Sequence, residues 1–414
     1  MNPSNRPNPW IGIFLPFALG YYLSYLLRTV NAVISPDLTQ DLSLSAADLG
    51  LLTSAYFLTF AMAQIPLGIA LDRFGPRKVE GGLLLLAALG AASFAMGDSL
   101  TELGLARGLI GLGVSACLMA GLKGFAMWYP AERQSSMTGY IMSAGALGAL
   151  TASAPIEAVL PLLGWRGVFW IIAVIAAGVA AFIFMSLPNQ APHASGESVG
   201  QAFRSVGRIF AARSFLRYAG SAVFFTGGFM ALQSLWAVPW LMNVNGLTLT
   251  QAANHLLVLN LGMLGGQLSI GILGTRLARR GVTPLNLMQG GFSLMLLVEV
   301  LILMQVGPLA VLWFLLGLLS SVNAQSYLAT SMHFPKAAFG RVSTAINLMA
   351  FVGAFAVQWG LGGVLDGLQA EGWEMSTALK AAFGGLLVLQ VLTLLPLLMG
   401  GRAVPHPSHQ SPGK

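Results

Sequence analysis

Long apolar stretches recur along the whole chain and are separated by short polar connections. Each runs for roughly 20 residues, the length that a helix needs to cross the hydrocarbon core of a bilayer. The pattern predicts an all-α membrane protein with twelve transmembrane helices. Their expected spans are 10–35, 49–71, 79–97, 103–128, 135–161, 166–187, 217–242, 251–274, 285–306, 309–333, 342–365 and 377–400.

Composition supports the membrane assignment. Hydrophobic residues make up 56% of the 414 positions and charged residues only 8%, whereas a soluble domain usually carries about 25% charged residues. The first apolar run is too long for the core of a signal peptide, so we interpret it as a membrane helix. The single cysteine, Cys117, argues against a disulfide framework or a Cys-based metal site.

Lys and Arg residues fall almost entirely on one side of the predicted spans. If both termini are cytoplasmic, that side holds sixteen of them and the other holds only Arg166 and Lys380. This asymmetry is the positive-inside signature of a multi-pass protein in a bacterial-type inner membrane. It also accounts for the sequence pI of about 9.8, so a nucleic-acid partner is not expected. The partners expected are the lipid bilayer and a small solute.

The chain divides into two bundles of six predicted helices. The one long polar connection carries Arg204, Arg208 and Arg213 at helical spacing, which predicts a short basic helix on the membrane surface; a plain tether is the alternative. The expected divisions are an N-terminal bundle over 1–188, a linker over 189–216, a C-terminal bundle over 217–400 and a disordered tail over 401–414.

The two bundles are related by an internal repeat. The segment that begins at Gly68 aligns without a gap with the segment that begins at Gly271, at an offset of 203 (271 − 68). Pro130 and Pro335 repeat at an offset of 205 (335 − 130). Two repeated segments at nearly the same offset indicate a tandem duplication of six helices.

The repeated loop resembles the signature loop of the major facilitator superfamily. It reads glycine-x-x-x-aspartate-arginine-x-glycine-x-arginine-lysine, and the matching residues are Gly68, Asp72, Arg73, Gly75, Arg77 and Lys78. Arg107 and the spaced glycines after it resemble the fourth-helix motif of the same superfamily. The resemblance implies two bundles around a central cavity, with access to the two sides alternating as one bundle rocks against the other.

These loop residues have readable physical roles. Gly68 and Gly75 permit close packing and a tight turn, and Asp72 can pair with a cation or with a helix N-terminus across the bundles. The basic residues Arg73, Arg77 and Lys78 anchor the loop at the membrane surface. We expect conformational gating here rather than a purely topogenic role. In the second copy of the loop Thr275 replaces the acid, so we expect a weaker gating contact from that copy.

Five ionisable residues are expected inside spans, where charge is expensive and marks function. They are Arg28, Arg107, Lys123, Glu157 and Glu299. Cations outnumber acids, which favours an anionic solute. For Arg107 the family motif implies packing and proton coupling. Lys123 either lines the cavity or extends to the interface. Neither acid is a convincing proton carrier, because Glu299 lies on a helix that is peripheral in the family and Glu157 lies near a span end.

Arg28 is the leading candidate for substrate contact. Tyr21, Tyr25 and Arg28 share one helical face, and Asn31 follows one turn later. A guanidinium among phenols suits bidentate capture of a carboxylate or phosphate. The stretch loosely resembles the first helix of the organophosphate and organic-anion branches of the superfamily. The alternative is a structural pair between Arg28 and an acid of a neighbouring helix.

The second bundle offers amides and aromatic residues. Gln233 and Trp236 lie in the seventh span, and Asn323 and Tyr327 are spaced i, i+4 in the tenth. These spans line the cavity in the resembled family, so we expect substrate contacts there. The alternative is that each side chain makes a helix–helix hydrogen bond.

These features predict a secondary active transporter that takes up a small organic anion, with protons as the coupling ion, and that works as a monomer. A proton-antiport exporter is one alternative, weakened because the exporters' fifth-helix glycine-proline motif is absent. A transporter-like solute sensor is another. An enzyme is not expected, since no nucleotide loop, metal-ligand spacing or nucleophilic triad is recognisable, and no cofactor or metal is expected.

Overall fold

The computed structural model describes residues 10–188, 199–335 and 338–399. Throughout these ranges the regular elements are helices, which confirms the predicted all-α membrane fold. The expected tail over 401–414 and the start of the expected linker lie outside the described residues. The short basic helix expected within that linker is present as α8 (Val199–Phe210), which carries Arg204 and Arg208.

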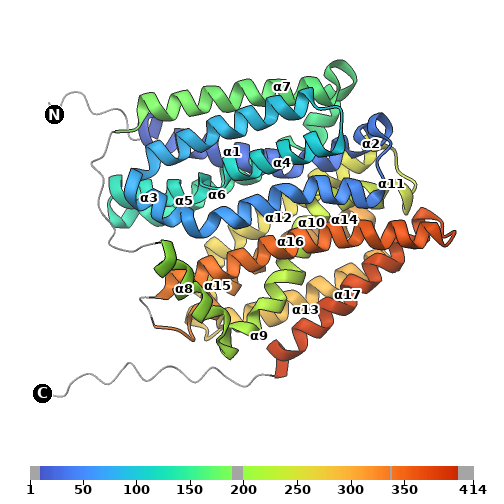
Figure 1. Ribbon diagram of the computed structural model, residues 1–414. Helices are drawn as coiled ribbons and strands as arrows, with labels where there is room; N and C mark the ends of the chain where they lie inside the picture. The colour runs from blue at the N-terminus through green and yellow to red at the C-terminus, as the bar shows by residue number, and fades with distance from the viewer. Residues whose placement is uncertain (1–9, 189–198, 336–337, 400–414) are drawn as a thin grey trace, which may run out of the picture.

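The helices of the first half lie along one another in the upper part of Figure 1. They are η2 (Trp10–Phe14), α1 (Leu15–Thr29), α2 (Asn31–Leu42), α3 (Ala46–Met96), α4 (Leu100–Val114), α5 (Cys117–Trp128), α6 (Ala131–Thr151) and α7 (Ala154–Ser186).

The second half follows α8 and occupies the lower part of the same view. Its helices are α9 (Arg213–Ser221), η3 (Ala222–Gly227), α10 (Gly228–Ala231), η4 (Leu232–Trp236), α11 (Ala237–Asn243), α12 (Leu249–Arg279), α13 (Pro284–Leu303), α14 (Leu309–Ser320), η5 (Ser321–Ala324), α15 (Gln325–Ser331), α16 (Phe339–Ala370) and α17 (Met375–Met399).

Helices long enough to cross a membrane are fewer than the twelve predicted spans, because α3 and α7 each continue through a sharp junction from one span into the next. Ten helices within the described ranges are long and apolar enough to cross a membrane. The 51-residue α3 joins the second and third spans at Gly75, where φ is 78°. The fifth span runs through α6 into the start of α7 and ends at Gly164, where φ is 61°. Both positions need glycine, because a side chain strains a left-handed backbone.

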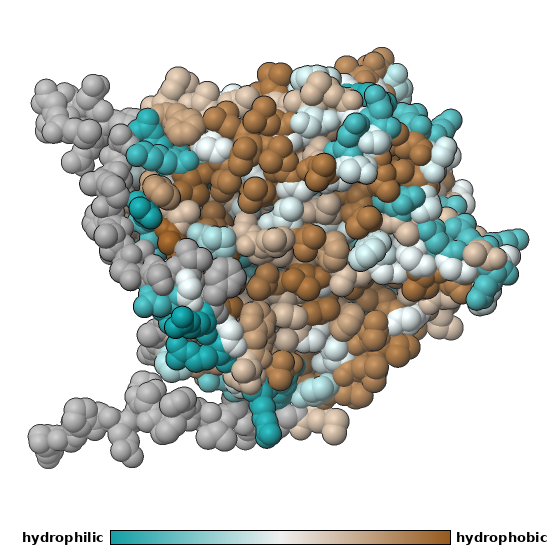
Figure 2. All heavy atoms as spheres, viewed as in Figure 1, coloured by the Kyte–Doolittle hydropathy of each residue, from teal (hydrophilic) through white to brown (hydrophobic). Residues whose placement is uncertain are grey.

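The outer surface matches a bilayer environment. Large apolar side chains such as Met62 and Val174 are about 70% exposed in the isolated chain. Figure 2 shows hydrophobic residues forming a broad band across the visible face, with polar residues gathered towards its two ends. We name the ends by residues they hold. The Gly75 end contains the junction in α3, and the Ser45 end contains the turn between α2 and α3.

Reciprocal glycines bring the two halves together near the Ser45 end. A Cβ at Gly362 of α16 would lie 2.3 Å from the Ala46 carbonyl oxygen, and a Cβ at Gly50 of α3 would lie 2.7 Å from that of Gln358. Real Cβ atoms do not approach an oxygen so closely. The absence of side chains at these two positions therefore allows α3 and α16 to cross in backbone contact.

An acidic side chain from the second half closes the same end. Asp366 of α16 accepts hydrogen bonds from the backbone N–H groups of Ala46 (2.9 Å) and Ala47 (3.0 Å). These donors belong to the first turn of α3, where N–H groups lack partners within the helix and the helix dipole favours an anion. Asp366 thus acts as a helix cap supplied across the interface between the halves, on top of the local cap from Ser45.

The glycine crossing predicts that bulk at Gly362 holds the Ser45 end open. In Gly362→Val the added carbons would overlap the Ala46 backbone, so the population should shift away from the closed arrangement. Spin labels at the exposed residues Glu102 and Glu371, one in each half, should move apart in double electron–electron resonance measurements. Gly363→Val is the matched control, because a Cβ there meets nothing within 4 Å. Unchanged distances in Gly362→Val would show that the crossing does not control closure.

Candidate functional site

Arg28 lies near the centre of the molecule, where α1 ends. Its side chain is only 4% exposed. The guanidinium carbon lies 4.4 Å from the ring centroid of Tyr25, 5.6 Å from that of Phe60 and 5.2 Å from that of Phe351. Since Phe60 belongs to α3 and Phe351 to α16, both halves of the protein contribute aromatic faces to this one cation.

Among the described residues, no carboxylate lies within salt-bridge distance of Arg28. Its Nε has no hydrogen-bond partner. Phenols from the first half, Tyr21, Tyr25 and Tyr56, are the groups that act on it electrostatically. The predicted structural alternative, a pair with an acid on a neighbouring helix, is therefore not what the described structure contains. A buried cation without an anion is costly, so the site is electrostatically prepared for an anionic ligand.

The two tyrosines before Arg28 lie on the face predicted for them. Their rings pack edge to face, with centroids 5.1 Å apart. The Tyr21 hydroxyl contacts the Met142 sulfur at 3.7 Å. Gly145 of α6 leaves room for both rings, because a Cβ there would lie 2.6 Å from Tyr21 and 2.9 Å from Tyr25. Packing against α6 thus fixes the aromatic side of the site.

A break in the first span shapes the backbone beside Arg28. The α1 helix ends at Thr29 and α2 begins at Asn31. The Leu27 carbonyl at this break accepts a hydrogen bond from Arg107 Nη1 at 2.8 Å. Arg107 is fully buried, and its Nε and Nη2 have no partner. Arg107 therefore supports the residue next to Arg28, in keeping with the packing role that the family motif implies.

Asn31 and Asn323 each bring an unpaired acceptor. The amide nitrogen of Asn31 donates to Thr53 at 3.1 Å, while its oxygen has no partner. Asn323 sits in the 3-10 turn η5 that interrupts the tenth span, and its amide oxygen is also unpaired. Both oxygens are buried, and a buried acceptor normally has a donor. They are suited to receive a hydroxyl group.

Tyr327 connects the second half to Arg28. It lies within electrostatic reach of both Tyr25 and Arg28. Its hydroxyl donates to Asn347 Oδ1 at 2.9 Å, and Asn347 Nδ2 donates to Gln64 Oε1 at 3.1 Å. This chain joins the tenth, eleventh and second spans on the Gly75 side of Arg28. The sequence alone gave no sign of the pairing between Asn347 and Gln64.

The structure assigns Gln233 and Trp236 to contacts between helices. Gln233 Nε2 donates to Asn260 Oδ1 at 2.6 Å, and Asn260 in turn donates to the Ala149 carbonyl in the first half at 3.0 Å. The Trp236 indole donates to the Gln358 carbonyl at 3.1 Å. These polar groups match the alternative considered above, hydrogen bonding between helices, in this conformation.

Lys123 contacts the signature loop and does not pair with a group of the Arg28 site. It forms an ion pair with Asp72, and the two side chains are 28% and 54% exposed. Both partners belong to the first half, so the pair does not cross between the bundles. The expected partner of Asp72 was a cation or a helix N-terminus across them. The difference arises because the ends of the second and fourth spans lie together at the Gly75 end.

The other loop residues occupy distinct environments. Gly75 forms the junction in α3, as expected for a tight turn. A Cβ at Gly68 would meet nothing within 4 Å, so close packing does not require glycine there in this conformation. Arg77 donates to the Phe184 carbonyl, and the Arg73 guanidinium lies 5.4 Å from the Phe74 ring centroid. The side chain of Thr275 lies outside the described residues.

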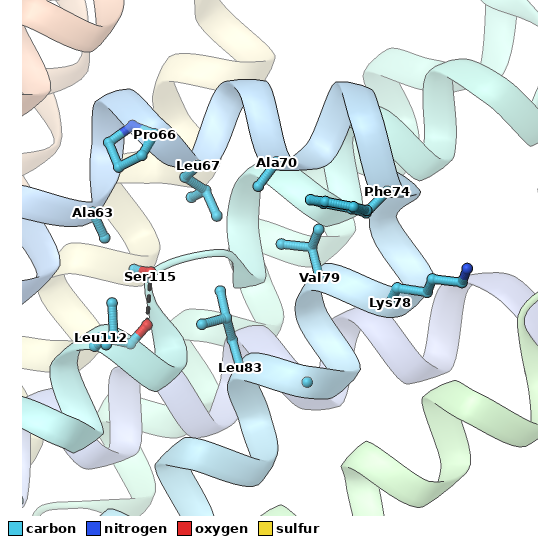
Figure 3. Close-up of a pocket in the computed structure, with 11 residues that line it drawn as sticks. Ala63, Pro66, Leu67, Ala70, Phe74, Lys78, Val79, Leu83, Leu112 and Ser115 are labelled. Atoms are coloured by element: carbon cyan, nitrogen blue, oxygen red, sulfur yellow. Dashed lines mark hydrogen bonds between the residues drawn. The ribbon is translucent and has the colours of Figure 1, made fainter. Parts of the chain in front are cut away.

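Lys78 borders an apolar hollow of about 460 Å³ that is separate from the Arg28 site (Figure 3). The second, third and fourth spans line it. The Ser115 hydroxyl within it already donates to the Leu112 carbonyl at 2.7 Å. Apart from Lys78 and Ser115 its lining is apolar, so the hollow is suited to apolar contents.

Sequence reasoning overlooked one buried acid. Glu80 lies at the start of the third span and is fully buried, and neither carboxylate oxygen has a hydrogen-bond partner. The statement that Glu157 and Glu299 are the acids inside spans was therefore wrong. Glu80 follows Lys78 by two residues, so it read as part of the charged loop. Glu157 is not isolated, since Thr250 of the second half donates to it at 2.6 Å.

A family model described as Major Facilitator Superfamily matches residues 17–358. The chain is 29% identical over 197 residues to the "Probable L-galactonate transporter" of Escherichia coli K12, covering 48% of this chain and 43% of that protein. It is 30% identical over 168 residues to the "Hexuronate transporter" of the same organism, covering 40% and 37%. The matched region thus spans less than half the length of these curated relatives.

Solved structures agree on the fold over nearly the full length. A bacterial homologue of the human lysosomal transporter Spinster, in an inward-facing and occupied conformation, superposes with a TM-score of 0.74 at 18% identity, covering 95% of this chain and 97% of that one. A D-xylose-proton symporter gives 0.72 at 16% identity, covering 93% and 96%. The family model covers most of the chain, and the chain therefore belongs to the major facilitator superfamily of membrane transporters.

Proposed function

We propose that this protein is a secondary active transporter that carries a small sugar acid across the inner membrane, with a proton moving in the same direction. The observation that carries the proposal is Arg28, a buried cation between the two halves that has no carboxylate to pair with among the described residues. A ligand carboxylate would supply the missing anion through bidentate hydrogen bonds. The relatives named for galactonate and hexuronate transport support this substrate class.

A sugar acid also carries hydroxyl groups, which the site can receive. Asn31 follows Arg28 by three residues and Asn323 precedes Tyr327 by four, and the amide oxygens of both asparagines are unpaired. Each can accept a hydrogen bond from a hydroxyl donor. A site that binds hydroxyls in this way rejects analogues that lack them, because its buried acceptors are then left unpaired. We therefore expect polyhydroxylated acids to be preferred over aliphatic acids of similar size.

The charge distribution gives the direction in which the site opens. Basic residues gather at the Gly75 end, with Arg73, Arg77 and Lys78 in the junction of α3, so we place this end in the cytoplasm. The Asp366 cap and the glycine crossing close the opposite end. Under this orientation the structure is sealed towards the outside, and the substrate leaves after the Gln64–Asn347 contact breaks.

Removing the Arg28 charge should stabilise the folded protein and abolish transport. In Arg28→Met a buried cation without an anionic partner gives way to an apolar side chain, so the unfolding temperature should rise. Transport of radiolabelled D-galacturonate into proteoliposomes should be lost. Arg208→Met on the exposed face of α8 is the matched control. A variant that is destabilised yet still transports would show that Arg28 is a structural residue.

Weakening the Asp72–Lys123 pair should slow turnover with little effect on stability. Both side chains are partly exposed, so the pair contributes at most about 1 kcal/mol to folding. Asp72→Asn and Lys123→Gln should each lower the rate of galacturonate exchange while galacturonate still binds. The double variant should be no slower than the slower single variant, since both changes remove one interaction. Fully additive losses would show that the two residues act separately.

A further inference from the structure

Glu80 occupies a setting unlike that of any other acid in the described structure. It lies five residues beyond the Gly75 junction, within the third span, and its exposure is 0%. Neither oxygen has a hydrogen-bond partner. Two basic residues at the same end are engaged elsewhere, since Lys123 pairs with Asp72 and Arg77 donates to the Phe184 carbonyl, and the Lys78 side chain is exposed. Among the described residues no cation pairs with Glu80, and the one polar group that acts on its carboxyl group is the Cys117 thiol, a weak donor.

Three helices enclose the carboxyl group. From α1, Gly20 lies directly against it, because a Cβ at Gly20 would come within 2.3 Å of Glu80 Oε1. Leu84 lies beside the same glycine from the third span. The thiol of Cys117 in α5 is the titratable group that faces Glu80, and α1 presents none at the contact. An ionised carboxylate with only a thiol beside it and no cation is costly in such a place, so burial favours the neutral, protonated form of Glu80.

The position of Gly20 links Glu80 to the substrate site. Gly20 immediately precedes Tyr21 and shares α1 with Arg28. Cys117 lies within electrostatic reach of both Glu80 and Arg28. The helix that carries Arg28, the cation proposed to bind the substrate, is thus the helix that covers the Glu80 carboxyl group. A movement of α1 away from the third span would admit water to Glu80, whereas an α1 in place excludes it.

Glu299, the buried acid of the second half, differs in this respect. Gln390 Nε2 lies 3.4 Å from its Oε1. It borders a cavity of about 30 Å³, enough for one or two waters. Trp240 and Trp313 line the same cavity, and their indole nitrogens and Glu299 Oε2 have no partner. Glu299 therefore has an amide donor and space for water beside it, which makes it the matched control.

We propose that Glu80 is the proton-carrying residue of the transport cycle. It holds its proton while Gly20 covers it. When α1 lifts from the third span, the O–H bond of the Glu80 carboxyl breaks, the proton passes to water, and the carboxylate that remains is stabilised by hydration. The inference rests on the proposed function, because it assigns the proton of that same transport reaction to one side chain.

The first test compares Glu80→Gln with Glu299→Gln, both of which keep the size of the side chain. In proteoliposomes, Glu80→Gln should lose accumulation of D-galacturonate driven by a pH gradient, with the concentration ratio falling to unity. Exchange of galacturonate at equal pH should fall by a few-fold at most and lose its dependence on pH. Glu299→Gln should accumulate galacturonate as the unmodified protein does. Normal accumulation by Glu80→Gln, or its loss in Glu299→Gln instead, would overturn the proposal.

A second test does not depend on the substrate. In the infrared spectrum of the purified protein, a carboxylic acid band that shifts in D₂O should be absent from Glu80→Gln. It should persist in buffers alkaline enough to ionise every solvated carboxyl group. If the protein transports no galacturonate, the proposed function fails, while this band still decides whether Glu80 holds a proton. Absence of the band from the unmodified protein at neutral pH would refute the assignment.

Discussion

The site is organised around an unpaired guanidinium that is held inside a membrane protein. Burial deprives Arg28 of water, and the described structure supplies aromatic faces and phenols in place of a carboxylate. Aromatic faces stabilise a cation only modestly, by about 0.5–2 kcal/mol each. An anionic solute can supply the remaining stabilisation that the buried Arg28 charge lacks. Because Phe60 and Phe351 come from opposite halves and stack at 4.0 Å, the same cation also senses whether the halves are together.

Neighbouring charges are arranged so that they leave this deficit in place. Asp72, the acid of the signature loop, is occupied by Lys123 at the Gly75 end. Arg107 interacts with a backbone carbonyl rather than an acid. Glu80, neutral under our proposal, would not compensate Arg28 either. An acid free to reach Arg28 would compete with the substrate that we propose, so the pairing of Asp72 with Lys123 would favour binding without any contact with the ligand.

The sequence was sufficient for the spans, the repeat, the Gly75 turn and the shared face of Tyr21, Tyr25 and Arg28, because these follow from hydropathy and helical periodicity. It was insufficient for partners. Lys123 meets Asp72 through the relative position of two helices, which periodicity does not contain. Glu80 was missed because it stands beside the basic loop, where an acid looks solvated.

The cap on α3 has a consequence for how this closure tolerates mutation. Asp366 supplies the acceptor as a side chain, whereas the donors are backbone N–H groups at positions 46 and 47. Any residue except proline provides such a donor. Substitutions at positions 46 and 47 other than proline therefore keep the backbone donors, and the contact depends on the identity of the side chain at position 366 alone. The two halves can diverge in sequence around the turn at Ser45 without losing their ability to recognise each other there.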